Sequence, residues 1–379
     1  MKVVIVRRVR GSTASIDIYA DNLASALRTV RPEWTIVEVE PTPWNSPDKL
    51  WMSGSGLRKY HECYWRYPRA VSKMEADIFH IVDHTDGHIA RRLRRTGQSA
   101  VVTCHDLVQA IQPERQSRFP ALSLAVWRYA VTGMREANHV IAVSSNTAKD
   151  IHKLLNIPSE CITVALNGVG PEFRVLSPAA VVSLRQQYTP SPETICLLNV
   201  GGTSQRKNIS TVLKVVASLR DRGFPICLWK TGAQFTPQQQ AFIAEHQIDR
   251  QIVHLGSPDK ETLVSLYNAA DILLSPSLYE GFGLTVVEAM ACGTPVITSN
   301  VSSLPEVIGT AAIALEPTDV EGIVSAVINL KTDPDRYKFF SNEGLNRSNF
   351  FKWETTAERV ANVYEKVLTS HQSRSGKYD

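Results

Sequence analysis

Short runs of apolar, mostly β-branched residues alternate along the chain with stretches in which apolar residues recur every three or four positions. Short, continuously apolar runs are typical of parallel strands buried on both faces, and the stretches between them are typical of crossover helices. The predicted strands form two series. The first covers residues 3–6, 78–82, 100–103, 140–143 and 162–164, and the second covers 195–200, 226–229, 252–255, 272–274, 296–298 and 311–315.

This alternation predicts an α/β protein with two domains, each built on a parallel sheet. The length of 379 residues also suits two domains of ordinary size better than one. A proline-bearing segment, residues 177–193, separates the two series of strands and predicts the junction between the domains. We therefore place the first domain at 1–175 and the second at 176–355, followed by a helix and tail at 356–379. The cleft between the two domains is the expected binding site.

Composition and charge narrow the class of protein. Hydrophobic residues at 43% and charged residues at 21% are typical of a soluble globular protein, and no apolar run reaches the length of a membrane span. The net charge of +4 is uneven, because residues 1–175 hold 23 Lys and Arg against 17 Asp and Glu. This half is therefore the one expected to meet an anionic partner or a membrane surface. No nucleic-acid motif accompanies the charge, so nucleic acid is not an expected partner.

The cysteines and the first residues of the sequence indicate the cellular compartment in which the protein is expected. The six cysteines form no C-x-x-C pair, and most lie in apolar, strand-like runs. They are expected to be reduced thiols in the core of a cytoplasmic protein. The opening MKVVIV is interrupted by two arginines too soon for a signal peptide and instead predicts a first strand.

The most informative stretch holds Glu280 and Glu288, eight residues apart, around a Gly-Phe-Gly turn between a predicted strand and a predicted helix. Open α/β sheets bind ligands at this position, outside the carboxyl end of a strand. The backbone N–H groups of residues 281–284 and the positive end of the helix favour an anion, and the carboxylates accept hydrogen bonds from hydroxyls. A ligand with phosphates and several hydroxyls fits, which points to a nucleotide sugar. The alternatives are a Thr285-x-x-Glu288 capping box and a Glu280 that is merely exposed in a loop.

Two glycines and two cations follow the first strand of the second series. Gly201 and Gly202 let the backbone turn closely beside a ligand, and Arg206 and Lys207 then stand at the start of a helix. Two cations at a helix N-terminus are unfavourable unless an anion compensates them. A pyrophosphate is such an anion, with Arg acting as a fork and Lys as a point charge. The alternative is a solvated basic turn.

The string SPSLYEGFGLTVVEAMACGTPVITSN, residues 275–300, resembles the E-x7-E signature of the retaining glycosyltransferases of family 4. The likeness continues upstream in IVHLGSPDKETLVSLYNAADILLSPS from Ile252 and downstream in SSLPEVIG from Ser302. The resemblance implies the GT-B fold, in which two Rossmann-like domains face each other and the active site lies in the interdomain cleft. It also implies that the last helix crosses back to the first domain.

The same resemblance implies roles for the matching residues. Arg206 and Lys207 are implied to bind the pyrophosphate, and Glu288 is implied to bind the ribose hydroxyls. Glu280 is implied to contact the donor sugar, and His105 to lie near the 6-hydroxyl of that sugar. In such enzymes the departing phosphate takes the acceptor proton, so these groups chiefly position the substrates and neutralise charge. Catalysis is thus assigned to His105, Glu280, Arg206 and Lys207. The other residues implied at the nucleotide sugar are Gly11, Gly202, Lys230, Gly256, Ser257, Gly281, Phe282, Gly283, Leu284 and Thr285.

Polar residues after the strands of the first domain leave more than one interpretation. His105 and Asp106 follow a strand, a position where such a pair is often structural. Asp83 and His84 follow the preceding strand and are assigned to the acceptor, with a metal as the alternative. No partner cluster with ligand spacing is evident, and the D-x-D of residues 333–335 follows a helix rather than a strand. The prediction is therefore a metal-independent site without a cofactor.

Residues 44–69 are rich in aromatic and cationic side chains. Three interpretations stay open: contact with a membrane surface, stacking on an acceptor saccharide, and an ordinary packed helix and loop. The first would place a cytoplasmic protein peripherally on the inner face of the membrane.

The predicted reaction is transfer of a hexose from a nucleotide sugar, with the anomeric configuration retained, to a saccharide or lipid-linked saccharide in polysaccharide or glycoconjugate synthesis. UDP-glucose is the first choice of donor, because UDP-sugars are common in the resembled family, and GDP-mannose is the second. Two other classes are a nucleotide-sugar epimerase, which needs no acceptor, and a catalytically silent scaffold of the same fold.

Overall fold

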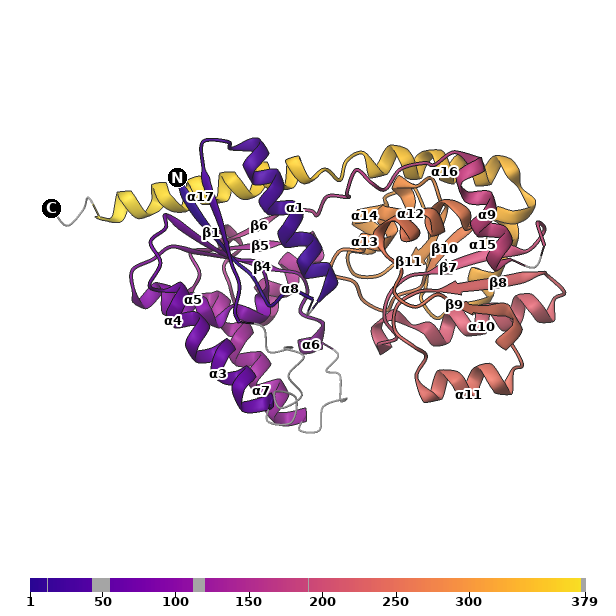
Figure 1. The fold of residues 1–379 in the computed structure, drawn as a ribbon, viewed down its shortest axis with the longest axis horizontal. Coiled ribbons are helices and arrows are strands. Elements are labelled where there is room, and N and C mark those ends of the chain that lie inside the picture. Colours follow the sequence, from indigo (N-terminus) through magenta and orange to yellow (C-terminus); the bar gives the residue numbers. More distant parts are fainter. Residues whose placement is uncertain (12, 43–54, 112–119, 190, 376–379) are drawn as a thin grey trace. The chain divides into compact units, whose positions relative to one another are not determined.

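The computed structural model describes residues 1–11, 13–42, 55–111, 120–189 and 191–375. The chain divides into two compact units (Figure 1). Unit 1 consists of Met1–Gly168 and Trp353–Asp379, and unit 2 consists of Val169–Lys352. The predicted domain boundaries, 175/176 and 355/356, fall a few residues later in the chain.

Unit 1 is built on a six-stranded parallel sheet with the order β2-β1-β3-β4-β5-β6. Strands β3, β4 and β5 are buried along their whole length, as expected for continuously apolar parallel strands. The six strands are β1 (Lys2–Val6), β2 (Thr35–Val39), β3 (Ile78–Ile81), β4 (Ala100–Cys104), β5 (His139–Ala142) and β6 (Ile162–Val164).

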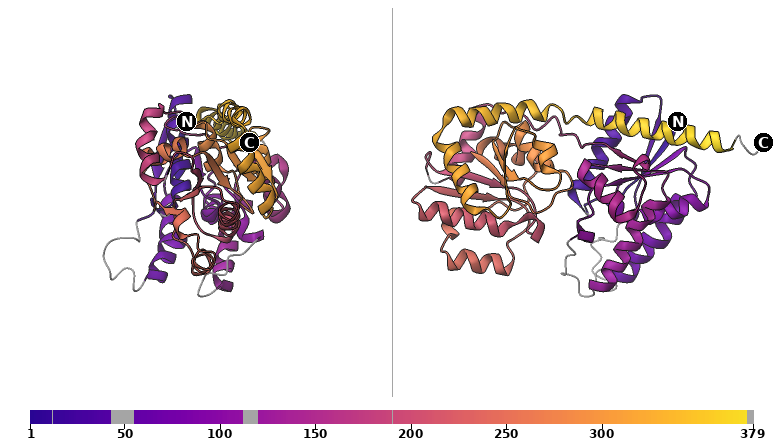
Figure 2. Two further views of the ribbon diagram at one scale, coloured as in Figure 1. Left: turned by 90° about the vertical axis from the view of Figure 1, so that its right-hand side faces the viewer. Right: turned by 180° about the vertical axis from the view of Figure 1, so that it is seen from behind.

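The helices of unit 1 include the last helix of the chain, which packs beside the first (Figures 1 and 2). Arg31, at the end of α1, donates to Glu358 at 2.9 Å and to Glu365 at 3.3 Å, both on α17. The helices are α1 (Ala14–Val30), α3 (Ser55–His61), α4 (Tyr67–Val71), α5 (His88–Arg95), α6 (Val108–Ile111), α7 (Pro120–Thr132), α8 (Ser145–Leu155) and α17 (Trp353–Ser375). Short turns are η1 (Glu62–Arg66), η2 (His84–Asp86), η3 (Gly133–Glu136) and η4 (Ser159–Cys161).

Unit 2 repeats the same architecture with the order β12-β11-β10-β7-β8-β9, again all parallel. Its strands are β7 (Ile195–Asn199), β8 (Ile226–Lys230), β9 (Ile252–His254), β10 (Ile272–Ser275), β11 (Val296–Ser299) and β12 (Ile313–Leu315). Its helices are α9 (Pro178–Tyr188), α10 (Ile209–Asp221), α11 (Pro237–Glu245), α12 (Lys260–Ala269), α13 (Leu284–Ala291), α14 (Leu304–Ile308), α15 (Val320–Thr332) and α16 (Pro334–Ser348), with turns η5 (Gln205–Lys207) and η6 (Asp249–Gln251). Each unit therefore has the Rossmann-like α/β architecture that the alternating pattern predicts.

All eleven predicted strands are present, with ends that differ by two residues or fewer, but β2 was missed. This strand lies at the edge of the sheet, and its residues are only partly buried. Its polar Glu38 receives hydrogen bonds from Arg7 at 2.5 Å and from Arg28 at 2.8 Å. The strand prediction relied on continuously apolar runs. In β2 the ion-paired carboxylate of Glu38 interrupts the apolar residues, so this strand does not match the pattern.

The segment expected to form the domain junction is different in the structure. Residues 178–188 form α9, which begins with Pro178 in the first turn, where a missing N–H costs no hydrogen bond. Arg185 of this helix donates to the carboxylate of Asp271 at 2.8 Å and to the carbonyl of Ala269 at 2.7 Å. These contacts fasten α9 within unit 2, and the chain passes between the units at Gly168–Val169 and at Lys352–Trp353 instead.

Candidate active site

Most of the predicted site residues of unit 2 lie in loops that follow three strands of one parallel sheet. Residues 201–207 follow β7, Gly256 and Ser257 follow β9, and residues 280–284 follow β10. Parallel strands bring these loops to the same edge of the sheet. Two backbone hydrogen bonds join the loops directly. Leu278 N–H donates to the carbonyl of Arg206 at 2.7 Å, and Gly232 N–H donates to that of Gly256 at 2.5 Å.

Glu280 lies at the centre of this edge and binds both predicted cations. Its Oε2 accepts from Arg206 at 2.9 Å, and its Oε1 accepts from Lys207 Nζ at 2.6 Å and from Ser277 Oγ at 2.7 Å. The side chain is 10% exposed. Burial alone would raise the pKa of Glu280, but Lys207 and Arg206 hold this pKa at about 2. Glu280 is thus a buried, ionised bridge and not an exposed loop residue, and the two cations do not form a solvated turn.

Two serines outside the predicted set hold the loop of Glu280 in place. Glu280 N–H donates to Ser302 Oγ at 2.9 Å, and Ser303 Oγ contacts the carbonyls of Glu280 and Phe282 at 2.8 and 3.0 Å. Gly283 adopts φ +103°, and a Cβ there would lie 2.9 Å from Leu304, so a larger residue would be strained. Ser302 and Ser303 belong to the SSLPEVIG stretch that resembles the family. That resemblance marks the two serines, but sequence spacing does not show that they contact the loop of Glu280.

Glu288 lies on α13, one turn deeper than expected, and it is not a capping residue. The helix begins after Gly283, and no side chain caps it, so the Thr285–Glu288 capping box is absent. Glu288 is 4% exposed, and its Oε2 accepts from the Tyr267 hydroxyl at 2.8 Å. Burial raises the pKa of Glu288 to about 7, although the Tyr267 hydrogen bond acts in the opposite direction. A pair of donating hydroxyls, such as those of a ribose, would favour the ionised form.

Lys230 is the last residue of β8 and is completely buried. Its Nζ donates to the carbonyl of Gly201 at 2.6 Å and to that of Thr231. Desolvation by burial, and then the nearby Lys207 ammonium, lower the pKa of Lys230 to about 8. The lysine thereby ties the glycine-bearing loop after β7 to the end of β8 and adds positive charge beside Lys207.

The glycines at this edge differ in their backbone conformation and in the space that a side chain would have. Gly201 has φ +126°, and a Cβ on Gly232 would lie 2.2 Å from the Gly201 carbonyl oxygen, so these two loops approach too closely for a side chain. A Cβ on Gly202 or on Gly256 meets no atom within 4 Å, although Gly256 has φ +61°. Ser257 is exposed beside Gly256.

The titration of Lys230 predicts a pH dependence of anion binding. An anion stabilises the ammonium form, whose pKa without that anion is about 8, so binding is accompanied by proton uptake at higher pH. The contribution of Lys230 to the affinity for UDP is therefore expected to be fully present below about pH 7 and to be lost as the pH rises through about 8. Isothermal titration from pH 6.5 to 9.5 measures this fall. The variant Lys230→Met should bind more weakly at pH 7 and lose the slope, and an unchanged slope would contradict the role of Lys230.

In unit 1, His105 follows β4 and has a defined tautomer. Its Nε2 lies 2.8 Å from the carbonyl of Val82, which can only accept, so Nε2 carries the proton and Nδ1 is the acceptor. Burial lowers the pKa of His105, although the charge of Asp83 opposes this effect. The ring also packs edge-on against Tyr19, with centroids 4.8 Å apart. A neutral imidazole with Nδ1 as acceptor suits a sugar hydroxyl.

Asp83 and His84 lie at the same edge of the unit 1 sheet as His105 but are engaged with protein groups. Asp83 is 2% exposed, and its carboxylate accepts from Arg8 at 2.9 Å and from Thr85 N–H at 2.8 Å. His84 Nδ1 lies 3.3 Å from Asp83 and 3.4 Å from the His105 N–H. Gly11, after β1, is exposed, and its N–H donates to Asp17 at 2.8 Å. Both side chains therefore already contact protein groups beside His105, and their assignment to the acceptor stays a prediction.

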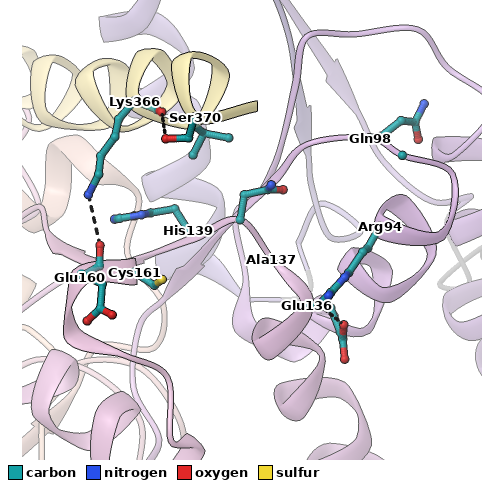
Figure 3. Close-up of a pocket in the computed structure, with 12 residues that line it drawn as sticks. Arg94, Gln98, Glu136, Ala137, His139, Glu160, Cys161, Lys366 and Ser370 are labelled. Carbon is teal, nitrogen blue, oxygen red and sulfur yellow. Dashed lines mark hydrogen bonds and ion pairs between the residues drawn. The ribbon is translucent and has the colours of Figure 1, made fainter. Parts of the chain in front are cut away.

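A cavity of about 450 Å³ in unit 1 lies away from these residues (Figure 3). It is lined at the amino end of β5, where Figure 3 shows Arg94 facing Glu136 and Lys366 reaching toward Glu160. Arg94 donates to the carboxylate of Glu136 at 2.7 Å, and Lys366 Nζ donates to the backbone carbonyl of Glu160 at 3.2 Å. None of the predicted site residues lines this cavity.

The residues that the structure describes contain no cluster of three or more His, Cys, Asp or Glu with the geometry of a metal site. Asp333 of the D-x-D sequence caps α16, with its carboxylate accepting from Arg336 N–H at 3.0 Å, and Pro334 is in the first turn. This arrangement agrees with the interpretation of D-x-D as the start of a helix.

Two family models match the chain in succession. Residues 17–173 match the model described as Glycosyltransferase Family 4, and residues 183–347 match Glycosyl transferases group 1. The chain is 27% identical to the serotype-specific mannosyltransferase WbdA of Escherichia coli over 315 residues, which are 80% of this chain and 38% of that protein. It is also 29% identical to the O-antigen chain mannosyltransferase B of Escherichia coli over 286 residues, which are 73% of this chain and 72% of that protein.

Among solved structures, HepE of Anabaena in complex with UDP-glucose superimposes with a TM-score of 0.74 over 97% of this chain and 100% of that one, at 18% identity. This likeness concerns the fold. The two sheets, the two successive family matches and the mannosyltransferase relatives together support a glycosyltransferase with the two-Rossmann-domain GT-B fold. The chain spans only 38% of the length of WbdA, so what that whole protein does is not transferred to it.

Proposed function

We propose that the chain is a retaining glycosyltransferase of family 4 that transfers a hexose from a nucleoside diphosphate sugar to a hydroxyl of a saccharide or lipid-linked saccharide. The observation that carries the proposal is the buried bridge between Glu280, Arg206 and Lys207 at the N-terminus of α13. Two cations, a helix N-terminus and two buried carboxyl groups at one sheet edge match a diphosphate flanked by two hydroxyl-bearing sugars.

In the proposed mechanism, the diphosphate binds Arg206 and Lys207 and replaces part of their contact with Glu280. The carboxylate of Glu280 then accepts a hydrogen bond from a hydroxyl of the donor sugar. Glu288, whose neutral form is favoured by burial, becomes ionised when the ribose hydroxyls donate to it. The developing negative charge on the leaving diphosphate is stabilised by cations already held in place, which lowers the barrier without a covalent intermediate on the protein.

Among the candidate donor sugars, we propose mannose first. Both relatives reported above are named mannosyltransferases, at 27–29% identity, whereas the complex with UDP-glucose shares 18% identity and informs the fold alone. UDP-glucose, the first choice from the sequence, remains the second donor to test. The loop at Gly256 and Ser257 offers chiefly main-chain groups to a base, so side chains discriminate little between UDP and GDP.

The test is a panel of GDP-mannose, UDP-glucose, GDP and UDP, measured by calorimetric binding and by slow hydrolysis of the donor, with and without a chelator. At least one donor is expected to bind and to be hydrolysed at the same rate in both conditions. Proton NMR of the first product should show the anomeric configuration of the donor. Binding of no nucleotide sugar would refute the proposal, affinity that collapses with the chelator would refute metal independence, and an altered free sugar without transfer would indicate an epimerase.

We further propose peripheral contact with a membrane through unit 1. No helix in the described part of the chain is long and apolar enough to cross a bilayer. However, Trp65 on η1 is 52% exposed, and Leu122 and Tyr129 on α7 are 59% and 53% exposed. Arg69 stacks over Trp65, with its guanidinium carbon 3.6 Å from the ring centroid, so aromatic and cationic groups lie together. The rest of the aromatic stretch, at 44–54, lies outside the described residues.

This contact predicts salt-sensitive cosedimentation with anionic vesicles. Attachment to phosphatidylglycerol vesicles is expected at low salt and should weaken as salt rises, because exposed charges are screened. Trp65→Ser with Leu122→Ser should reduce the bound fraction severalfold without lowering the affinity for the nucleotide. The matched control is Phe350→Ser in unit 2, which removes an apolar side chain that is 70% exposed and should leave the bound fraction unchanged. Equal recovery of the protein with and without vesicles would contradict membrane contact.

A further inference from the structure

Unit 1 contains a second cavity, of about 240 Å³, and part of its lining comes from the aromatic and cationic stretch at 44–69. Arg8, after β1, and Asp86, at the end of η2 after β3, contribute charged groups to it. Tyr60 on α3, Tyr64 on η1 and Trp127 on α7 contribute aromatic rings to its lining. The cavity therefore opens at the carboxyl ends of two strands, the edge at which parallel sheets bind ligands.

The carboxyl group of Asp86 is the distinctive feature of this cavity. Its side chain is 17% exposed, and no hydrogen bond to its carboxyl oxygens is found among the described residues. The nearest guanidinium nitrogen, Arg8 Nε, lies 3.9 Å away, because Arg8 donates to Asp83 instead. Burial raises the pKa of Asp86 to about 7, an effect that Arg8 only partly opposes. A shielded carboxyl without donors is expected to accept hydrogen bonds from a ligand.

The aromatic walls and the volume specify what kind of ligand fits. Tyr64 is held by stacking on Tyr60, with centroids 5.8 Å apart, and by His88, with centroids 4.4 Å apart. Tyr67 presents only its ring, since its hydroxyl donates to backbone carbonyls. Drug-sized ligands occupy about 300–1,000 Å³, so this smaller cavity suits a single ring. A pyranose has C–H groups for aromatic faces and a rim of hydroxyls for charged side chains, whereas an acyl chain would leave the charges unpaired.

We propose that this cavity binds one pyranose unit of the acceptor saccharide. Lys59 also lines the cavity. Asp86 accepts from a sugar hydroxyl, Arg8 and Lys59 donate to neighbouring sugar oxygens, and Tyr60 and Trp127 pack against the C–H face. Asp83 lies between this pocket and the surroundings of His105. It pairs with Arg8 on one side and lies beside His84 on the other, and His84 is in turn next to the backbone N–H of His105. That the pyranose belongs to an acceptor rests on the proposed function, but the existence of the pocket does not.

The test uses the full chain and the methyl α-pyranosides of mannose, glucose and galactose as probes. Saturation-transfer NMR and tryptophan fluorescence at tens of millimolar sugar are expected to show binding of at least one of them. Asp86→Asn should weaken this binding about tenfold or more, because a charged acceptor is lost. Tyr60→Ala, which changes a side chain that is 41% exposed and so preserves the fold, should weaken it as well. Trp127→Phe should abolish the fluorescence change.

Asp77→Asn is the matched control, since it makes the same chemical change at an exposed aspartate of unit 1. Nucleotide affinity, measured on the same samples, should be unchanged in all these variants. The pocket is refuted if the wild type binds nucleotide but no pyranoside, or if Asp86→Asn and Tyr60→Ala bind as well as Asp77→Asn. Pyranoside binding that depends on Asp86 in a chain that binds no nucleotide sugar would support the pocket and count against the proposed function.

Discussion

Glu280→Gln is expected to lower kcat by about 100-fold while nucleotide affinity is maintained or increased. Glu280 neutralises Arg206 and Lys207 through contacts of 2.9 and 2.6 Å. Without its charge, both cations attract a diphosphate at least as strongly, so UDP binding does not suffer. The donor sugar, however, loses an anionic acceptor, and the cations lose the group that orients them, so the reactive geometry is populated less.

Steady-state kinetics and calorimetry with UDP separate these two effects. Glu321→Gln is the matched control, because it neutralises an exposed glutamate that pairs with Arg222 on the surface of unit 2. A Glu280→Gln variant with wild-type kcat would show that this carboxylate has no part in the reaction. A variant that melts early and binds no UDP would instead assign Glu280 to the stability of the loop.

Arg206→Ala and Lys207→Ala are each expected to weaken UDP binding by about 1.5–3 kcal/mol, the scale of a hydrogen bond between charged groups. Each removal leaves Glu280 with only one cation, so the remaining positive charge is more strongly neutralised and less available to a phosphate. In the double variant Arg206→Ala/Glu280→Gln the loss should be smaller than in Arg206→Ala alone. Such a difference is the coupling free energy that a double-mutant cycle measures.

Arg222→Ala is the control for these variants, since Arg222 makes a surface ion pair in the same unit and is 41% exposed. Its UDP affinity should match that of the wild type. The affinity of the wild type should also decrease with ionic strength, and Arg206→Ala should show a weaker decrease. If Arg206→Ala and Lys207→Ala bind UDP as tightly as Arg222→Ala, the diphosphate is bound elsewhere and the proposed mechanism is wrong.

Much of the fold is encoded locally and was predictable from the sequence. Continuous apolar runs predicted eleven of the strands, because a strand buried on both faces needs apolar residues at every position. The Gly-Phe-Gly turn placed Glu280 at a strand-to-helix connection, where it lies, whereas Glu288 lies one turn deeper in α13 than expected. The edge strand β2 escaped because its half-exposed residues follow no continuous pattern, and α9 was mistaken for a linker because prolines flank it.

The sequence by itself determined which residues stand at the sheet edge, because strand and helix periodicity locate the point where each strand ends and a loop begins. Only the tertiary structure decided which of them touch. Glu280 meets Arg206 across 74 positions of the chain, Glu288 meets Tyr267, and Lys230 is buried under the Gly201 loop. No described residue donates a hydrogen bond to Asp86, because Arg8 donates to Asp83 instead. Such pairings depend on how parallel strands bring distant loops together and on which groups lose water there, and neither is a local property of the chain.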